Sequence, residues 1–472
     1  MTSKVMDVIV IGCGASGIAA LRRLHDAGLK AVGLEAADRV GGRICTVEFG
    51  AAAVDIGAAW CEGAVNNAVF DLADPLELLE PERPATKWFV SSNGELVPTE
   101  LGSDLVKGLD EAINSADKTG TKSISECVSA SVHNNIESFK KNPHLAKSFV
   151  EWYERNNHVG GQNDPKEGKS LRGLEECFVD RNVMLNWKGR GYKTVLDILL
   201  NKYPDPSKEL PIKIILNKEV VSIKWRTNQP GRETDIPLVH VKCKDGSLFA
   251  AKSVIVTVSI GVLKKKCAQL FNPPLPTEKV NTINNLQLCV LGKIYIEFTE
   301  AWWPKTPASF AILWRDEDKA KFTADEQWIT EIYGLDTVAH QPNVLLTWIY
   351  GNGALQMEKA SQQQVKDGVI KLLDLVLKKQ FNVTPVKSIL RTQWGSDPLT
   401  GGAYAYRSVA LEEKGGSAAI LGEPLYHGNG FPVVCFAGEA TSYRNHGAVH
   451  GAVEAGYREA DRLIESFKEF SM

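Results

Sequence analysis

The sequence lacks any long apolar segment, any close pair of cysteines and any excess of charge. No apolar run reaches the roughly 18 residues that a membrane-spanning helix needs. The nine cysteines are scattered singly, which argues against a disulfide scaffold or a structural zinc site and for a reducing compartment. A formal net charge of −3 gives no electrostatic reason to expect a nucleic-acid partner. We therefore expect no metal site, no nucleic acid and no membrane.

Addressing signals are also missing. The apolar stretch near the N-terminus runs straight into a glycine motif, and no small-residue cleavage site follows a basic start. The last three residues, Phe470-Ser471-Met472, do not match the peroxisomal S-K-L signal. We expect a cytosolic protein. Its 472 residues, 44% hydrophobic and 24% charged, indicate an ordinary globular chain of two or three domains.

The first 35 residues read as one βαβ unit. Residues 7–11 (DVIVI) form a continuous β-branched run, as expected of a parallel strand that is buried on both faces. Residues 18–27 have apolar positions at helical spacing, and residues 31–34 (AVGL) form a second apolar strand. The unit has the length that a dinucleotide-binding motif requires.

A glycine motif joins the first strand to the helix. Gly12, Gly14 and Gly17 make a GxGxxG, in which the first glycine forms the tight turn and the second lets a pyrophosphate approach. The third glycine lets the helix and strand pack closely. Free N–H groups at the helix start favour phosphates. Glu35, at the end of the second strand, is placed to accept hydrogen bonds from ribose hydroxyls, so we predict a dinucleotide site.

The next loop separates FAD from NAD. Arg39 and Arg43 flank Gly41 and Gly42, and we expect this loop to form a second anion site, because arginine binds phosphate through a planar fork. The loop resembles the R-x-G-G-R element of glutathione-reductase-like flavoproteins, especially flavin amine oxidases. NAD dehydrogenases do not normally carry it.

A second cluster lies near the other end of the chain. Residues 433–436 read as an apolar strand, followed by Gly438-Glu439-Ala440-Thr441 and by a predicted helix from about Gly447 to Phe467 with small residues at its start. This pair resembles the segment of flavin amine oxidases that holds the ribityl chain and the flavin ring. The resemblance implies that the positive end of the helix dipole stabilises the reduced flavin.

Three more segments are similar to polyamine oxidases. Residues 256–264 (VTVSIGVLK) resemble the family's VTVPLGVLK, with Ser259 where proline is usual, and residues 394–404 resemble W-x-S-D/N-P followed by G-[ST]-[FY]. Residues 55–63 match D-x-G-A-x-W-x-[EH]-G. The matches cover nearly the whole chain, which resembles flavin monoamine and polyamine oxidases, with polyamine or spermine oxidase as the nearest branch.

The resemblance implies an α/β fold with a glutathione-reductase-like, Rossmann-type FAD-binding domain. We expect this discontinuous domain to comprise residues 1–85, 185–280 and 390–472. A sheet-plus-helix substrate-binding domain is expected from residues 86–184 and 281–389. The implied flavin contacts are Gly12, Gly14, Ala15, Ser16, Gly17, Glu35, Ala36, Arg39, Gly41, Gly42, Arg43, Gly57, Ala58, Trp60, Val220, Trp394, Gly438, Glu439, Ala448 and Val449.

Three residues are implied in catalysis. Lys293 matches the lysine that hydrogen-bonds through a water to flavin N5, and Glu62 matches a position that would hold a substrate ammonium. Tyr404 matches one wall of an aromatic cage, whereas Ala448 stands where a second tyrosine completes that cage in monoamine oxidases. Ala403 replaces the cysteine that binds FAD covalently in monoamine oxidases, so we predict non-covalent FAD.

The expected reaction is hydride transfer from a polyamine (spermine, spermidine or an acetylated form) to FAD, with imine hydrolysis and O₂ reoxidation giving H₂O₂. Oxidation of an aromatic monoamine or an amino acid is the alternative, and a flavin-binding scaffold without turnover is a third. The expected partners are the amine and O₂, with a monomer or a dimer as the assembly. His450 is a site residue or a core histidine.

The remaining chain is less distinctive. Residues 100–180 favour helices, and residues 212–258 favour strands, with a hairpin turn at Asp245-Gly246. Strands are also predicted at residues 293–298 (KIYIEF) and 344–350 (VLLTWIY), and a helix at Gln362–Leu377. A polar surface turn is expected at Thr227–Thr234.

Overall fold

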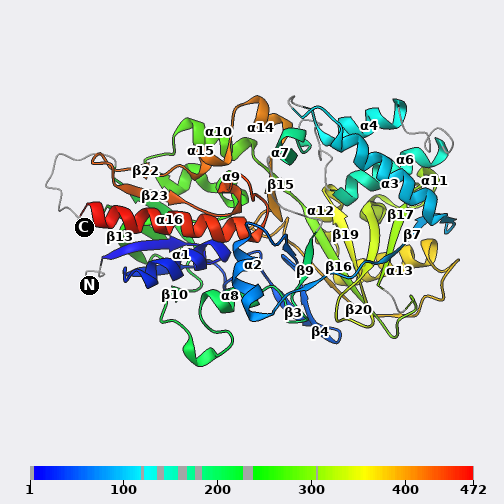
Figure 1. Ribbon diagram of the computed structural model, residues 1–472, viewed down its shortest axis with the longest axis horizontal. Coiled ribbons are helices and arrows are strands. Elements are labelled where there is room, and N and C mark those ends of the chain that lie inside the picture. Colours follow the sequence, from blue (N-terminus) through cyan, green and yellow to red (C-terminus); the bar gives the residue numbers. More distant parts are fainter. Residues whose placement is uncertain are drawn as a thin grey trace.

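The computed structural model describes residues 5–118, 122–134, 143–157, 167–175, 183–226, 238–304 and 307–470. Figure 1 shows an elongated molecule with two lobes, and both chain ends lie at the far tip of one of them. Each lobe is built around one large sheet. The predicted turn at Thr227–Thr234 and the cysteine at position 177 lie outside the described residues.

The first lobe contains a nine-stranded sheet. Five of its strands are parallel and adjacent, in the order β10 (Ile214–Ile215), β2 (Ala31–Leu34), β1 (Met6–Ile11), β13 (Leu248–Val256) and β23 (Pro432–Phe436). The sheet is completed by β11 (Val220–Trp225), β12 (Val239–Cys243), β14 (Phe271–Asn272) and β22 (Leu425–Tyr426). The predicted hairpin at Asp245-Gly246 is confirmed, because β12 and β13 pair antiparallel across it.

The parallel strands end at one edge of this sheet. Since ligands of open α/β sheets bind beyond the carboxyl ends of the strands, this edge is where a dinucleotide is expected. The strands lead into Gly12 after β1, Glu35 after β2, Thr257 after β13 and Gly438 after β23, so these residues lie at that edge.

Two helices from opposite chain ends pack together on this sheet (Figure 1). They are α1 (Ala15–Asp26) and α16 (Val449–Glu469). A Cβ on Gly456 of α16 would lie 2.2 Å from the Ser16 carbonyl oxygen, so only glycine allows this approach. α16 begins two residues later than predicted, because Gly447 has a positive φ of 77° that a right-handed helix excludes.

The second lobe contains a seven-stranded sheet. Its order is β20 (Val386–Arg391), β16 (Leu291–Phe298), β19 (Val344–Tyr350), β18 (Ile332–Thr337), β17 (Ala308–Leu313), β7 (Thr86–Ser91) and β8 (Leu96–Val97). One face packs on α12 (Asn352–Lys359) and α13 (Gln362–Val376). Part of the other face is covered by α3 (Thr99–Asn114), α4 (Ile124–Asn134) and α6 (Pro143–Asn157). The predicted strands and the helix at 362 are confirmed.

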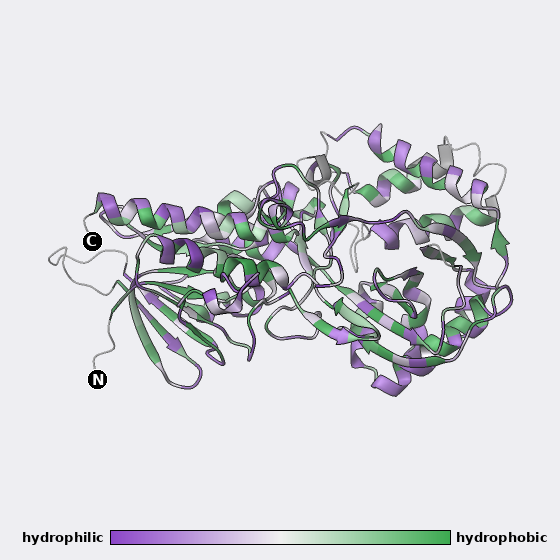
Figure 2. Ribbon diagram, turned by 60° about the horizontal axis from the view of Figure 1, so that its bottom comes forward, coloured by the Kyte–Doolittle hydropathy of each residue, from purple (hydrophilic) through white to green (hydrophobic). Residues whose placement is uncertain are grey.

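Figure 2 shows apolar residues concentrated on the strands, whereas the helices carry both apolar and polar residues. This pattern is that of sheets buried beneath amphipathic helices. The other helices of the described chain are α2 (Ala68–Ala73), α7 (Leu171–Glu175), α8 (Thr194–Leu199), α9 (Ile260–Leu270), α10 (Thr277–Asn285), α11 (Asp316–Lys319), α14 (Val409–Glu413) and α15 (Ala418–Gly422). Short 3₁₀ segments are Asp74–Leu76, Pro206–Lys208, Ala324–Glu331 and Glu439–Thr441.

Three small sheets complete the fold. They pair β3 (Thr46–Phe49) with β4 (Ala52–Asp55), β15 (Gln287–Cys289) with β21 (Tyr404–Tyr406), and β9 (Met184–Asn186) with both β5 (Cys61–Glu62) and β6 (Glu80–Pro81). The eight cysteines within the described ranges are all free thiols. In the described part of the chain, no helix is both long and apolar enough to cross a bilayer.

Candidate active site

A single cavity of about 1330 Å³ is lined by residues from both lobes. Of the predicted site residues, it brings together the three proposed for catalysis and all the proposed flavin contacts except Gly17. These residues come from segments hundreds of positions apart in the chain. The fold therefore gathers these residues around one cavity.

The glycine turn forms part of the cavity wall. Gly12 has a φ of +94°, and its missing Cβ would lie 2.7 Å from the Thr257 hydroxyl. A Cβ on Gly17 would lie only 1.9 Å from the Gly12 carbonyl oxygen. Gly17 therefore acts on the turn from behind and does not line the cavity, unlike the direct contact that we predicted. Its role is the close packing of helix and strand.

Glu35 supports the glycine turn as well as facing the cavity. Its carboxylate accepts hydrogen bonds from the Cys13 N–H at 2.7 Å and from the Ala37 N–H at 2.9 Å. The side chain is buried, with 8% exposed. A carboxylate offers about four lone-pair sites, so these two bonds leave acceptor capacity toward the cavity.

The two arginines of the second loop have partners within the protein. Arg39 donates to the carbonyls of Val40, Gly42 and Ile44, and so closes its own loop. Arg43 donates to the Ala403 carbonyl at 3.0 Å and to the Glu439 carboxylate at 2.8 Å. The loop turns three of its carbonyls toward the Arg39 guanidinium group, and Arg43 ties the loop to the C-terminal part of the site. The predicted anion site at this loop stays a prediction.

Glu439 organises the C-terminal part of the site. Besides the ion pair with Arg43, its buried carboxylate accepts from the N–H groups of Ala405 and Gly447. These bonds fix the loop that leads into α16. The N-cap residue of α16 is Ala448, whose side chain cannot accept a hydrogen bond. The first N–H groups of α16 therefore have no side-chain cap, and they lie at the cavity wall.

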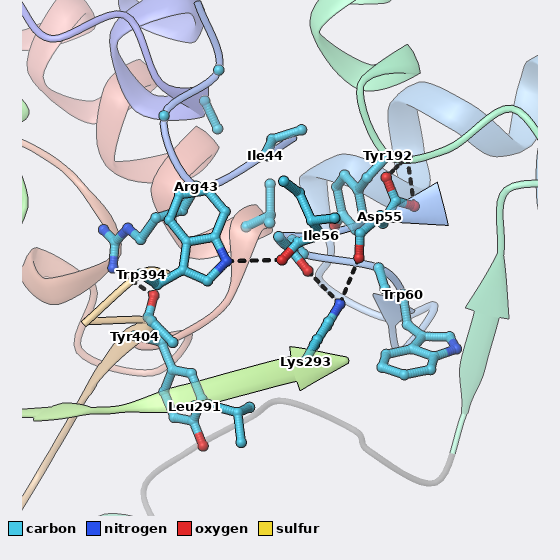
Figure 3. Close-up of a pocket in the computed structure, with 18 of the residues that line it drawn as sticks. Arg43, Ile44, Asp55, Ile56, Trp60, Tyr192, Leu291, Lys293, Trp394 and Tyr404 are labelled. Carbon is cyan, nitrogen blue, oxygen red and sulfur yellow. Dashed lines mark hydrogen bonds between the residues drawn. The ribbon is translucent and has the colours of Figure 1, made fainter. Parts of the chain in front are cut away.

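Lys293 is buried in the cavity wall, with 5% of its surface exposed. Its ammonium group donates to the Asp55 carbonyl at 2.8 Å and to the Gly57 carbonyl at 2.6 Å. Figure 3 shows Lys293 rising from β16 between Trp394 and Trp60. Burial lowers the pKa of Lys293 from 10.5 to about 8, because a charged group is poorly solvated there, and Asp55 opposes this shift.

Asp55, one of the two residues whose carbonyls bind Lys293, is itself held by hydrogen bonds. The Asp55 carbonyl also accepts from the Tyr295 hydroxyl at 2.7 Å, and its carboxylate accepts from Thr46 and from the Tyr192 N–H. Burial raises the pKa of the Asp55 carboxyl to about 6, against the opposing effects of Thr46 and Lys293. These bonds fix Asp55, whose carbonyl is one of the two that hold the lysine.

Aromatic side chains form the other walls. Trp394 donates its indole N–H to the Ile56 carbonyl at 2.8 Å (Figure 3). The Tyr404 hydroxyl lies 3.4 Å from the Lys169 ammonium, which also lies 5.4 Å from the centre of that ring. A Cβ on Gly447 would lie 3.2 Å from the Tyr404 ring, so glycine there lets the chain pass close to the tyrosine.

His450 lies in the cavity wall at the start of α16, with 3% of its surface exposed. Burial lowers the pKa of its imidazole to about 4, so the ring is neutral at physiological pH. His450 is therefore buried, as a core histidine is, and it also lies in the cavity wall, as a site residue does.

Sequence reasoning missed the cavity face of the seven-stranded sheet. Lys87, Ser309 and Asp336 lie side by side on β7, β17 and β18, and Trp348 lies opposite Lys293 on β19. The strand containing Trp348 was predicted from its apolar run. Its pairing with the lysine strand was not, because pairing between distant segments leaves no local signal.

No described cysteine lines the cavity. In the described ranges, no group of three or more histidine, cysteine, aspartate or glutamate side chains has the arrangement of a metal site.

Comparison with known proteins identifies the family. Residues 15–464 match the model for flavin containing amine oxidoreductase. The chain is 30% identical to bovine peroxisomal N(1)-acetyl-spermine/spermidine oxidase, over 97% of this chain and 94% of that protein. It is 26% identical to probable polyamine oxidase 5 of Arabidopsis thaliana, over 99% of each.

A redesigned putrescine oxidase has the same fold, with a TM-score of 0.70 at 19% identity over 98% of this chain and 99% of that one. The predicted mixed α/β, glutathione-reductase-like architecture is therefore confirmed. The chain belongs to the family of flavin-containing amine oxidoreductases.

Proposed function

We propose that the protein oxidises polyamines such as spermine, spermidine or N-acetylated polyamines, with non-covalent FAD as the hydride acceptor. One observation carries this proposal: the glycine turn and Lys293, Glu62 and Tyr404 line the same cavity. The names of the relatives, which include acetyl-spermine/spermidine oxidases and plant polyamine oxidases, support the substrate class.

The residues present fit FAD. The Ser16 hydroxyl is buried at the start of α1 and has no hydrogen-bond partner within the described residues, which suits a phosphate oxygen. Glu35 would hold the ribose, and the start of α16 would face the flavin ring. Ala403 offers no thiol for a covalent link, which supports a dissociable cofactor. The Lys218 and Glu219 side chains lie beside Val220 in the cavity wall at the expected adenosine end.

When bound, FAD accepts a hydride and passes the electrons to O₂, giving H₂O₂. The hydride leaves the carbon next to the amine nitrogen, whose lone pair forms the C=N bond. Water then cleaves this imine to an aldehyde and a shorter amine. The nitrogen must be neutral for this step, so a site that excludes water and offers few strong acceptors favours it.

The chain's own residues would divide the remaining work. We propose that Lys293 holds a water molecule on the cavity side of its ammonium group, as the matching lysine does in the family. Glu62 would bind a substrate ammonium that does not react. Tyr404 would form one aromatic wall, and Ala448 leaves the opposite side open, which accommodates a substituted secondary amine better than a closed two-ring cage does.

We further propose that residues 1–85, 185–280 and 390–472 form the FAD-binding domain, and residues 86–184 and 281–389 the substrate-binding domain. The separate sheets of the two lobes support this division. The free thiols of the eight described cysteines support a reducing compartment, and we propose the cytosol. We propose a monomer or a dimer as the assembly.

Anaerobic reduction tests the proposal directly. The purified yellow protein is mixed with spermine, N-acetylspermine, spermidine, tyramine or an amino-acid mixture, and the visible flavin band is followed. We expect bleaching by polyamines alone. Bleaching by tyramine or amino acids alone would identify a different oxidase, and no bleaching by any of them would refute oxidation. After acid precipitation, a yellow supernatant indicates non-covalent FAD and a yellow pellet contradicts it.

A further inference from the structure

Trp348 lies directly opposite Lys293 in the seven-stranded sheet. β16 and β19 pair antiparallel, with Lys293 in register with Trp348. Side chains of directly opposed residues lie on the same face of the sheet and contact one another. Both residues line the cavity, so the indole and the lysine side chain are neighbours in its wall.

The Lys293 ammonium group is held on two sides. The Asp55 and Gly57 carbonyls accept two of its three N–H donors. The centre of the Trp348 ring lies 4.8 Å from Nζ, and that of the Trp60 ring lies 5.9 Å away. Both distances fall within the range of cation–π attraction, and Trp348 is the closer ring.

Trp348 is itself held in place. Trp60 stacks on it, with ring centres 5.8 Å apart and an interplanar angle of 29°. The Trp60 side chain is hydrogen-bonded to the Glu82 carboxylate. Trp60 lies in the same segment as Asp55 and Gly57, so one stretch of chain supplies both carbonyls and the ring that backs Trp348.

We propose that Trp348 is a positioning residue, which holds the Lys293 ammonium group against the Asp55 and Gly57 carbonyls. Its importance for turnover rests on the proposed function, whereas its effect on the lysine does not. Nothing in the sequence motifs assigns this tryptophan a role. The proposal also extends to Trp60, which stacks on Trp348 and lies 5.9 Å from Nζ itself, and to Glu82, which acts on the lysine through Trp60.

The contact has a measurable electrostatic consequence. The indole face attracts the charged lysine and not the neutral one, so it raises the proton affinity of Lys293. Removal of the ring leaves the burial in place and should lower the pKa further below about 8. The titratable groups that face this lysine are Asp55 on β4 and Tyr295 on β16, with Glu82 beyond Trp60, and the Trp348 variants keep all three.

The test is a titration of Lys293 in the flavin-bound protein. Lysines are labelled with ¹³C at Cε, and the Lys293 signal is identified by its absence in Lys293→Met. We expect the midpoint to fall by about half a pH unit or more in Trp348→Leu, and by less in Trp348→Phe, which keeps a ring. The control is Trp88→Leu, because Trp88 stacks on Phe310 in the same sheet but does not line the cavity.

An unchanged midpoint in a folded Trp348→Leu protein would overturn the proposal. If this variant does not fold, Trp348→Phe and Glu82→Ala replace it, and both must lower the midpoint. The pH profile of kcat gives a second readout, in which the limb that Lys293→Met abolishes should move to lower pH in Trp348→Leu. If no amine reduces the flavin, the proposed function fails, and the NMR midpoint still decides the role of Trp348.

Discussion

The two ends of the cavity hold their functional groups by different means. At the nucleotide end, backbone atoms dominate: glycines at positive φ, a helix start and carbonyls bound by Arg39. At the substrate end, side chains dominate: Lys293 and Trp348 come from one face of the seven-stranded sheet, Glu62 from β5 and Tyr404 from β21. The first end depends on short stretches of chain with fixed backbone geometry. The second depends on which strands pair and in which register.

The difference predicts opposite responses to mutation. A substitution at the nucleotide end should distort the local fold and so abolish flavin binding, because the glycine turn has no freedom to adapt. A change in the side-chain-built end should leave the flavin bound and alter chemistry or affinity. The four predictions below test this contrast, from the largest expected effect to the smallest.

Gly17→Ala should be the most damaging of these changes. The new Cβ would lie 1.9 Å from the Gly12 carbonyl oxygen, so the turn must move. We expect a loss of about 4 kcal/mol in unfolding free energy and a colourless purified protein. Urea unfolding and visible absorbance measure both. Gly28→Ala is the control, because no atom lies within 4 Å of its added Cβ; its positive φ of 76° should cost about 1 kcal/mol, and the flavin should stay bound.

Lys293→Met should slow flavin reduction by about a hundredfold or more while the protein stays yellow, since loss of a group that handles a proton typically costs that much. Stopped-flow reduction by the best amine measures the rate, and the flavin absorbance measures occupancy. Loss of the flavin in this variant would contradict the expectation that changes at the substrate end leave the cofactor bound.

The same lysine should make stability depend on pH. Its folded pKa of about 8 lies below its ordinary 10.5, so the unfolded chain binds more protons between these values and stability rises with pH there. The full difference corresponds to about 3 kcal/mol, which is an upper bound. Urea unfolding at neutral pH and at about pH 10 should show a larger rise in the unaltered protein than in Lys293→Met. Lys279, whose pKa burial also lowers to about 8, contributes equally to both proteins. Asp55 is ionised in both states across this range and does not contribute.

Glu62→Gln should have the smallest effect. We expect KM for a polyamine to rise about tenfold with kcat little changed, since a hydrogen bond to a charged group is worth about 1.5 kcal/mol. Steady-state kinetics with a monoamine is the control, because it has no second ammonium for Glu62 to bind. An equal rise in KM for both substrates would show that the carboxylate does not select a remote charge.

The contrast also explains what the sequence could predict. The βαβ unit, the glycine turn, Glu35 and the start of the last helix are local, so motif and spacing indicated them. Lys293 was found through its resemblance to a family motif. Trp348 and Asp336 were missed, since their place in the cavity depends on the order β16-β19-β18, which no single segment encodes.

Gly17 and Arg39 show what a motif leaves open. Both were included among the expected flavin contacts, yet Gly17 packs behind the turn, in the role that its spacing indicated, and Arg39 binds loop carbonyls. A motif records which residues a geometry requires. It does not distinguish the atoms that meet a ligand from those that hold the frame.

The ion pair between Arg43 and Glu439 joins residues 396 positions apart, and both line the cavity. During synthesis, Arg43 emerges from the ribosome long before Glu439, β23 and α16 are made. The glycine turn of the nascent chain is therefore exposed before the C-terminal part of the cavity wall exists. We therefore expect cofactor loading to follow completion of the chain, and a stop just before α16 to yield a nearly full-length protein that holds no flavin.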